Sequence, residues 1–266
     1  MREKYWYLKH CDLFGHLSDE EMRGMESRSR MRKIPRNSPI YLPIDQADGV
    51  LLLADGQVKI CSVTPDSKQS ILAFVEPGEL FGELAMFEAG SREEFAEATM
   101  SSTVILIPAH ILRDIAEGNP RLAMGVTRLL GLRRRRIERR LKYLLFRSNR
   151  ERLIHLLLEL AEDYGRVDSH SPTGEVRLGI KLSHQDLASI IGSTRETVTV
   201  ILGQLQHEGF LRLGRRKISM RHLDRLAESV NAQPPRLATP ATSAEPRLNS
   251  PLGPVIFQTV TVSSKL

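Results

Sequence analysis

The chain has few of the residues that build disulfides, metal centres and membrane spans. Its two cysteines, Cys11 and Cys61, lie far apart, so they form neither a disulfide framework nor a CxxC metal motif, and they suit a reducing cytoplasm. A run of about 18 apolar residues, the length that a membrane-spanning helix needs, is absent. Residues 1–9 are aromatic and charged, which argues against a secretory signal.

The residue patterns of enzymes and of RNA readers are also missing. No nucleophile–base pair, phosphate-binding loop or metal-ligand cluster occurs at a usable spacing, so the sequence does not predict an enzyme. We interpret His184 and His207 as solvated helix-surface residues rather than catalytic ones. The aromatic-rich motifs of RNA-binding domains are absent as well.

Charge is distributed unevenly along the 266 residues, which are enough to form two domains. Residues 1–118 hold 13 Lys and Arg against 19 Asp and Glu, whereas residues 119–266 hold 25 against 13. This asymmetry predicts that the C-terminal half meets a polyanion.

Residues 182–210 carry the most informative pattern, two short amphipathic helices joined by a tight turn. Ser183 is a natural N-cap with Asp186 three residues on, and Gly192 allows the chain to reverse. Ser193 and Glu196 form a second capping pair. The apolar stripes that would face inward are Leu187, Ile190, Ile191, Val198, Ile201, Leu202 and Leu205. The layout predicts a helix-turn-helix, whose second helix enters the major groove of DNA.

The run Gly-Ser-Thr-Arg-Glu-Thr-Val at residues 192–198 resembles the recognition helix of the Crp/Fnr (catabolite activator protein) family of bacterial transcription regulators. Residues 55–59 and 81–85 resemble its β-roll, and the resemblance extends over roughly residues 8–225. It implies an α+β fold with an N-terminal antiparallel, cyclic-nucleotide-binding-like β-roll, a long dimerisation helix and a C-terminal winged helix-turn-helix. Double-stranded DNA and a second copy of the chain are the implied partners, with RNA polymerase left open and no membrane.

The predicted recognition helix contains the residues that we expect to contact DNA bases and phosphates. The guanidinium of Arg195 can take O6 and N7 of a guanine, and Glu196 can accept from cytosine N4 unless it serves only the cap. Val200 stands where many members carry a second arginine, which removes one guanine contact or replaces it by contact with a thymine methyl. Further candidates for phosphate or thymine contact are Ser193, Thr194, Thr199, Gln185 and, at the tip of a basic wing, Arg215 and Arg216.

We expect four segments. Short β-rich runs separated by turn residues predict a roll or sandwich within a sensor domain at residues 1–118. A long helix at residues 119–146 connects it to a DNA-binding domain at residues 147–230. Residues 231–266 are rich in Pro, Ser, Thr and Ala, which predicts a disordered tail.

The long helix carries an apolar seam with steps of four and three residues, typical of a coiled coil. Pairing with its twin in a homodimer is favoured over packing on its own domain, because two-fold symmetry suits a palindrome. We interpret the arginine run at residues 133–136, extended by Arg139 and Arg140, as a solvated face, with Arg134 pairing with Glu138 of the same or the partner chain. The seam consists of Ala123, Thr127, Leu130, Arg134, Ile137, Leu141 and Leu144.

The resemblance implies a ligand pocket beginning at Gly82-Glu83-Leu84, where cyclic AMP binds in many members. Arg92 takes the place of the phosphate-binding arginine, but Glu93 stands where a hydroxyl is expected, or displaces the arginine if the alignment shifts by one residue. A carboxylate there would repel a phosphodiester. Ile137 and Glu138 replace a Thr-Ser pair that one member uses on adenine, so cyclic AMP is disfavoured. We expect Glu83 and Arg92 to form a structural salt bridge instead.

Other effectors of this family are no better supported. Two distant cysteines cannot supply the four thiolates of an iron–sulfur cluster, and a lone cysteine on a strand is more often a small buried hydrophobe than a haem ligand. An unidentified small molecule, or none, remains open. The alternative function is a cyclic-nucleotide-type interaction module that does not bind DNA, a reading that only Val200 favours.

Overall fold

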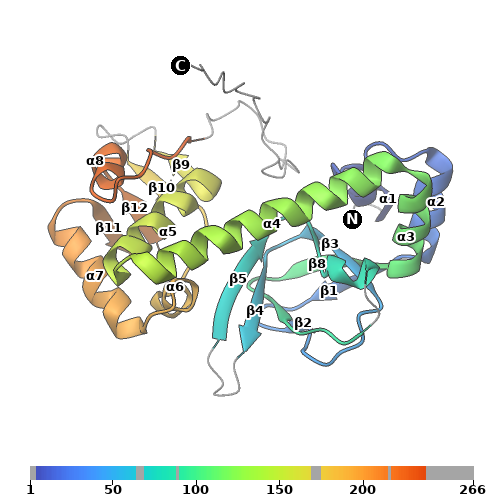
Figure 1. The fold of residues 1–266 in the computed structure, drawn as a ribbon, viewed down its shortest axis with the longest axis horizontal. Helices are drawn as coiled ribbons and strands as arrows, with labels where there is room; N and C mark the ends of the chain where they lie inside the picture. The colour runs from blue at the N-terminus through green and yellow to red at the C-terminus, as the bar shows by residue number, and fades with distance from the viewer. Residues whose placement is uncertain (1–3, 64–68, 88–89, 169–174, 215–216, 238–266) are drawn as a thin grey trace, which may run out of the picture.

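A long helix, α4 (Pro120–Phe146), joins a β-rich N-terminal part to a helical C-terminal part (Figure 1). The structure is a computed structural model, and it describes residues 4–63, 69–87, 90–168, 175–214 and 217–237. The arginines at the wing tip and most of the predicted tail therefore lie outside the described residues.

The N-terminal part is a roll of two four-stranded antiparallel sheets. One sheet has the order β1-β8-β3-β6, with β1 (Arg30–Ile34), β3 (Gly49–Asp55), β6 (Leu80–Phe81) and β8 (Ser102–Pro108). The other has the order β2-β7-β4-β5, with β2 (Pro39–Tyr41), β4 (Val58–Val63), β5 (Gln69–Val75) and β7 (Phe95–Ala98). Because side chains alternate along a strand, Val104 of β8 packs inside the roll while Ile105 packs outside it.

Three short helices cover the outer face of the first sheet, namely α1 (Lys4–Lys9), α2 (Asp19–Arg28) and α3 (Ala109–Gly118). Their apolar faces meet Ile105 and Ile107 of β8 in one buried cluster that also holds Phe14 and Met25. Cys11 lies in this cluster, and its burial raises the pKa of the thiol to about 12. At neutral pH this thiol is therefore protonated and packs as a small apolar side chain.

The C-terminal part combines helices with a small sheet. Its helices are α5 (Asn149–Tyr164), α6 (His184–Ile191), α7 (Arg195–His207) and α8 (Leu223–Glu228). The sheet has the order β11-β12-β10-β9, with β9 (Gly165–Val167), β10 (Val176–Leu178), β11 (Leu211–Gly214) and β12 (Lys217–Met220). Together with the roll and α4, it confirms the predicted α+β fold with a winged helix-turn-helix.

Helix α4 is held to both parts by its arginines. Arg133 forms an ion pair with Glu83 of the short 3-10 helix η1 (Glu83–Met86) and donates to the carbonyl of Leu80. Toward the C-terminal part, Arg139 pairs with Glu159 of α5 at 3.2 Å. Arg136 pairs with Asp163, near the end of the same helix, at 3.6 Å. The prediction that this run is a solvated face is confirmed for Arg135, Arg136 and Arg139, which are exposed. It is wrong for Arg133 and Arg140, which are partly buried because their guanidinium groups bond to the roll. Arg134 does pair with Glu138 of its own chain, at 2.8 Å.

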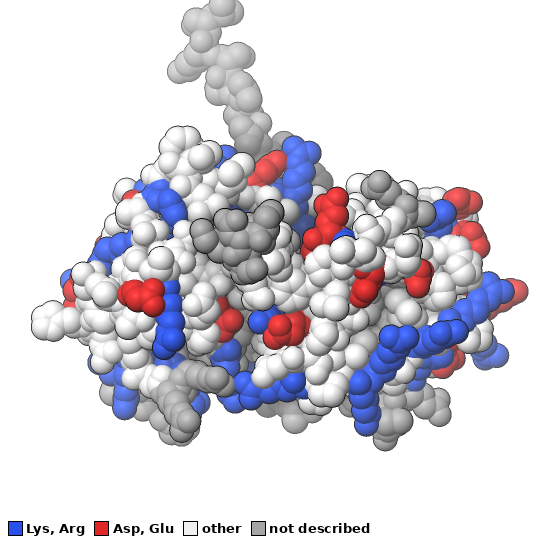
Figure 2. Space-filling view, turned by 90° about the horizontal axis from the view of Figure 1, so that it is seen from below, with Lys and Arg blue, Asp and Glu red and all other residues white. Residues whose placement is uncertain are grey.

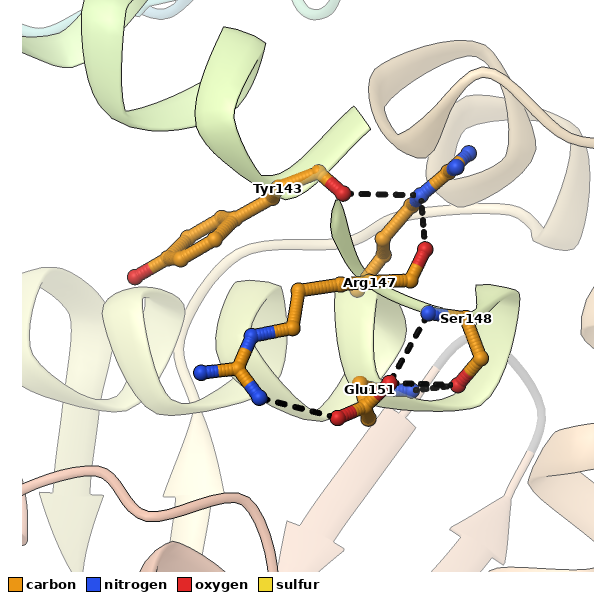
Figure 3. A network of polar contacts seen from close by, with 5 residues as sticks. Tyr143, Arg147, Ser148 and Glu151 are labelled. Atoms are coloured by element: carbon orange, nitrogen blue, oxygen red, sulfur yellow. Dashed lines mark hydrogen bonds and ion pairs between the residues drawn. The ribbon is translucent and has the colours of Figure 1, made fainter. Parts of the chain in front are cut away.

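The junction between α4 and α5 is a polar network (Figure 3). Ser148 caps α5 in a capping box, in which its hydroxyl accepts from the backbone N–H of Glu151 and the Glu151 carboxylate accepts from the backbone N–H of Ser148. These bonds hold the pKa of Glu151 down at about 2. The guanidinium of Arg152 donates to the carbonyls of Tyr143 and Arg147 at 3.2 and 2.9 Å, which ties the last turn of α4 to the first turn of α5.

The C-terminal part also docks directly on the roll. Cys61, Ile71 and Phe95 of the roll belong to the same buried cluster as the apolar side chains of α5 and α6. The Ser70 hydroxyl donates to the carbonyl of Ser189 at 3.3 Å, and Arg140 donates to the carbonyls of Ile71 and Leu72 in β5. Among the described residues, no helix combines the length and apolar character needed to cross a bilayer.

Candidate nucleic-acid interface

Local capping rules explain how α6 and α7 meet. Ser183 and Asp186 form the predicted capping box at the start of α6, with the Ser183 N–H donating to the carboxylate at 2.8 Å. Gly192 ends α6 in the left-handed region at φ 65°, a conformation that favours glycine and turns the chain toward α7. These two features confirm the predicted first helix and turn.

The start of α7 differs from the prediction by one residue. The N-cap is Thr194, whose hydroxyl accepts from the backbone N–H of Thr197 at 3.2 Å, so the predicted pair of Ser193 and Glu196 is wrong. Threonine caps a helix by the same geometry as serine, by accepting from the backbone N–H three residues further on. The sequence offers a hydroxyl for this role at both Ser193 and Thr194. The shift leaves the Glu196 carboxylate outside the cap. The predicted helix end at Gly209 is confirmed, with φ 82°.

The outward face of α7 is polar at its N-terminal end. Arg195 and Glu196 are both exposed in the first turn, while Val198, Ile201 and Leu202 are buried against the domain. Val200 lies on the exposed side and keeps 60% of its surface. An arginine, a carboxylate and an apolar group thus share one accessible face of a short rigid helix.

Two predicted contact residues are already bonded within the protein. The Thr199 hydroxyl donates to the carbonyl of Arg195 and lies 2.8 Å from Nδ1 of His184, so His184 links α6 to α7 and is not the isolated solvated residue that we expected. Gln185 is exposed on α6, where its amide donates to the Ser189 hydroxyl at 3.4 Å. Ser193 precedes the cap in the turn. The predicted wing forms from β11 and β12, but Arg215 and Arg216 at its tip lie outside the described residues.

Basic side chains occur on both halves of the surface. Seen from below, Lys and Arg are spread over the half that holds the C-terminal part, and a further row crosses the half that holds the roll (Figure 2). The edge strand β1 contributes exposed Arg30, Arg32 and Lys33 to the second half. The excess of acidic over basic residues within residues 1–118 is therefore not spread evenly over the surface of the roll.

The charged residues of the predicted sensor pocket are bonded to other groups of the protein. Gly82 takes φ 67°, and Glu83 is buried and pairs with Arg133 of α4. Arg92 instead donates to the carbonyls of Gly82 and Gly49, at 3.3 and 2.6 Å, so the predicted pair of Glu83 and Arg92 is wrong. Arg133 of α4 thus takes the place of Arg92 as the partner of Glu83. Leu84, the other residue predicted here, is exposed.

The carboxylate that faces this pocket is one residue away from the one that we expected. Glu93 is exposed, whereas Glu94 is partly buried and accepts from the Tyr41 hydroxyl at 2.9 Å. Burial, together with the neighbouring carboxylate of Glu83, raises the pKa of Glu94. Sequence reasoning missed Tyr41, Glu94 and Arg133 as pocket residues. The strand alternation of residues 94–98 was the available signal for Glu94, but nothing local to either residue pairs Arg133 with Glu83.

Comparison with known proteins matches both parts of the chain. Residues 31–119 match a cyclic nucleotide-binding domain, and residues 151–229 match a Crp-like helix-turn-helix domain. The transcriptional regulator SdrP of Thermus thermophilus is 35% identical over 195 residues, which cover 72% of this chain and 87% of that protein. A global nitrogen regulator of Nostoc is 31% identical over 188 residues, covering 70% and 82%. A crystal structure of a CRP/FNR-family regulator from Thermus thermophilus superposes with a TM-score of 0.62 at 28% identity, covering 77% of this chain and 100% of that one.

Proposed function

The chain belongs to the Crp/Fnr family of transcription regulators, and from this premise we propose that it binds palindromic duplex DNA as a homodimer. Helix α7 of each protomer enters the major groove N-terminus first, and the two-fold axis places the two helices one turn of DNA apart. The roll acts as the sensor, and its state sets the relative pose of the two recognition helices. The position of the operator relative to the promoter then decides between activation and repression.

The exposure of Arg195 and Glu196 at the start of α7 carries this proposal. The guanidinium is free to take O6 and N7 of guanine together, which is the commonest specific protein–DNA contact. The Glu196 carboxylate, which the cap does not use, is free to accept from cytosine N4. Adjacent positions on one helix turn thus read adjacent base pairs.

The surrounding residues supply positioning contacts. Ser193, Thr194 and Gln185 lie near the N-terminal ends of α6 and α7, where side chains and backbone N–H groups meet phosphate. The Thr199 hydroxyl is bonded internally, which leaves its methyl for a thymine, and Val200 offers an apolar contact of the same kind. Arg215 and Arg216, at the tip of the wing, contribute phosphate contacts. The operator therefore matches the family's half-site in its inner positions only.

The seam of α4 supports the homodimer. Ile137, Leu141 and Leu144 remain 59%, 53% and 41% exposed, although a solvated helix face ordinarily carries polar side chains. Phe146, in the last turn of the helix, is 79% exposed. A second copy of α4 packed along this stripe removes the apolar surface from water and forms the left-handed coiled coil that the spacing predicts.

The contacts of the pocket residues support our proposal that cyclic AMP is not the effector of this chain. Glu83, which lies in the pocket where other members bind cyclic AMP, pairs with Arg133, and Arg92 donates to backbone carbonyls. Glu94 adds a partly buried carboxylate near Arg92, which would oppose a negatively charged phosphodiester there. Ile137 is exposed on the seam rather than directed at a base. These contacts support a regulator that responds to another ligand or to none.

The remaining assignments follow the family. The protein acts as a regulator without catalytic activity in the cytoplasm, where the buried free thiols of Cys11 and Cys61 stay reduced. RNA polymerase becomes a partner where the operator adjoins a promoter. We propose a division into a sensor at residues 1–118, a dimerisation helix at 119–146, a DNA-binding domain at 147–230 and a tail at 231–266. The family matches at residues 31–119 and 151–229 support the sensor and the DNA-binding domain.

Selection of binding sites from random duplex DNA tests the main proposal. The wild-type dimer should enrich a palindrome with a conserved guanine in each half-site. Arg195→Gln should lose about 1–3 kcal/mol of discrimination at that base pair, because the bidentate contact is removed. Arg121→Gln is the matched control, since this exposed arginine lies at the far end of α4.

Salt dependence separates the proposal from the alternative module that does not bind DNA. A regulator that neutralises several phosphates loses affinity steeply between 50 and 200 mM salt, by a factor of about 10³ or more when it makes at least six phosphate contacts. A shallow salt dependence, together with no enriched sequence, would show that the helix-turn-helix no longer reads DNA.

A further inference from the structure

A histidine is buried where α4 meets α5. His155, in the second turn of α5, keeps 7% of its surface exposed, and no other histidine among the described residues is buried. Its ring stacks on the ring of Tyr143 in the last turn of α4, with the centroids 4.3 Å and the planes 15° apart. We call this contact the joint between α4 and α5, which is closed while the two rings are stacked.

One nitrogen of the His155 ring, Nε2, is shielded from solvent and has no hydrogen-bond partner among the described residues. In a neutral imidazole one nitrogen is a donor and the other an acceptor, whereas both are donors in the protonated ring. Protonation within the closed joint would therefore bury an N–H group without an acceptor, together with a positive charge. Both are costly away from water.

The charged groups around His155 do not offer the protonated ring a counter-ion. Those that act on it are Arg147 at the end of α4, and Glu151 and Glu159, one helical turn before and after it on α5. Glu151 pairs with Arg147 at 3.0 Å (Figure 3), and Glu159 pairs with Arg139 at 3.2 Å. Each carboxylate that could hold the imidazolium is thus already paired with an arginine.

The Tyr143 ring acts in the opposite direction, because the face of an aromatic ring attracts a cation. Burial and the positive charge of Arg147 outweigh that attraction, since the pKa of His155 lies below its ordinary value. The closed joint therefore holds the second proton less tightly than an exposed histidine does. Acid shifts the equilibrium toward an open joint as pH falls below about 6.5, the ordinary histidine value.

The packing beside the joint leaves room for such an opening. Tyr143 lines a cavity of about 20 Å³ next to Ile190 and Ile191 of α6. This volume is enough for about one water molecule, so the Tyr143 ring can shift away from His155 without displacing the first helix of the helix-turn-helix.

We propose that His155 makes the joint between α4 and α5 an acid-sensitive switch. The neutral ring stacks on Tyr143 and fixes the C-terminal part on the long helix, and the protonated ring leaves the stack for water. The opening depends only on contacts within one protomer. Its effect on DNA rests on the proposed function, because two recognition helices whose poses are not fixed no longer match two half-sites. Acid should therefore weaken specific DNA binding.

Hydrogen–deuterium exchange of the full-length protein, followed by mass spectrometry, measures the opening of the joint. The segment to observe is residues 143–156, at about pH 7.5 and about pH 5.5, after correction for the intrinsic pH dependence of exchange. We expect its opening in the wild type to rise about tenfold, which is the limit for one proton at one pH unit below the ordinary histidine value. Glu151 does not contribute in this window, because its pKa of about 2 leaves it charged at both pH values.

Two histidine variants isolate the switch. His155→Phe keeps an aromatic ring against Tyr143 without a titratable group, so its opening should change less than about twofold between the two pH values. His207→Gln is the matched control, because His207 is an exposed histidine in the last turn of α7, and it should respond to acid as the wild type does. If His155→Phe fails to fold, His155→Met gives the same comparison, since its flexible side chain adapts to irregular space.

Specific DNA binding, measured by fluorescence anisotropy at both pH values, tests the consequence. The wild type and His207→Gln should lose about tenfold more affinity on acidification than His155→Phe does. Equal opening of residues 143–156 at both pH values in the wild type, or an acid response that His155→Phe retains, would overturn the proposal. Absence of specific DNA binding by the wild type at about pH 7.5 would instead refute the proposed function, and the exchange measurement would still decide whether the joint is acid-sensitive.

Discussion

Ile44 is the residue where a single substitution should make the protein more stable. It is a β-branched side chain in the left-handed region, at φ 78°, and 82% of its surface is exposed. Its N–H donates to the carbonyl of Arg92, which holds the backbone in this conformation. Asparagine and glycine adopt the left-handed region far more readily than isoleucine does. Ile44→Asn and Ile44→Gly are therefore expected to relieve strain at little cost in packing.

The magnitude follows from three contributions. A non-glycine residue held in a sparsely populated backbone region costs about 1–3 kcal/mol. Full burial of an isoleucine stabilises by about 1.5–3 kcal/mol, so the small buried part of Ile44 contributes about 0.5 kcal/mol or less. Glycine loses a further 0.5–1 kcal/mol, roughly, in backbone entropy. The free energy of unfolding should rise by about 1 kcal/mol for Ile44→Asn and by somewhat less for Ile44→Gly.

Urea denaturation followed by circular dichroism measures this difference. Ile44→Val is the matched control, because it keeps the branched side chain and the strain and should unfold at the wild-type midpoint. If Ile44→Asn unfolds at or below the wild-type midpoint with an unchanged m-value, the strain is not stored at this residue and the reasoning fails.

Three further changes test other parts of the molecule. Glu83→Gln leaves Arg133 on α4 without a counter-ion and should lower the free energy of unfolding, measured by urea denaturation, by about 2 kcal/mol. Breaking a fully buried ion pair costs about 3–5 kcal/mol, but the Arg133 side chain is 25% exposed, so the loss is smaller here. Since the folded pKa of Glu151 is about 2, below its ordinary value, its contribution to stability is present above that ordinary value and is lost as pH falls toward 2. Ser148→Ala should flatten this acid dependence in thermal melts between about pH 5 and 2. Ile137→Lys should give monomers in sedimentation velocity, whereas Met124→Lys, exposed but off the seam, should stay dimeric.

Features that depend on near neighbours in the chain could be predicted from the sequence. Three such features are present in the structure: the capping box at Ser183, the turn at Gly192 and the helix end at Gly209. Each depends on backbone conformations and hydrogen bonds within a few residues. The uninterrupted run that forms α4 was recognisable for the same reason. The cap of α7 was misplaced by one residue, because Ser193 and Thr194 offer chemically equivalent hydroxyls and only the geometry of the turn selects between them.

Partners distant in the chain were decided only by the tertiary structure. Arg133 and Glu83 are 50 positions apart, and their pairing depends on how α4 crosses the roll. The sequence therefore identifies both charged residues but cannot predict that they form an ion pair. The helix-turn-helix and its outward Arg195 and Glu196 were determined by the sequence alone, since helical periodicity is local. The ion pair between the roll and α4 and the docking of α6 on β5 arise from the packing of separate elements. No spacing within one segment encodes that packing.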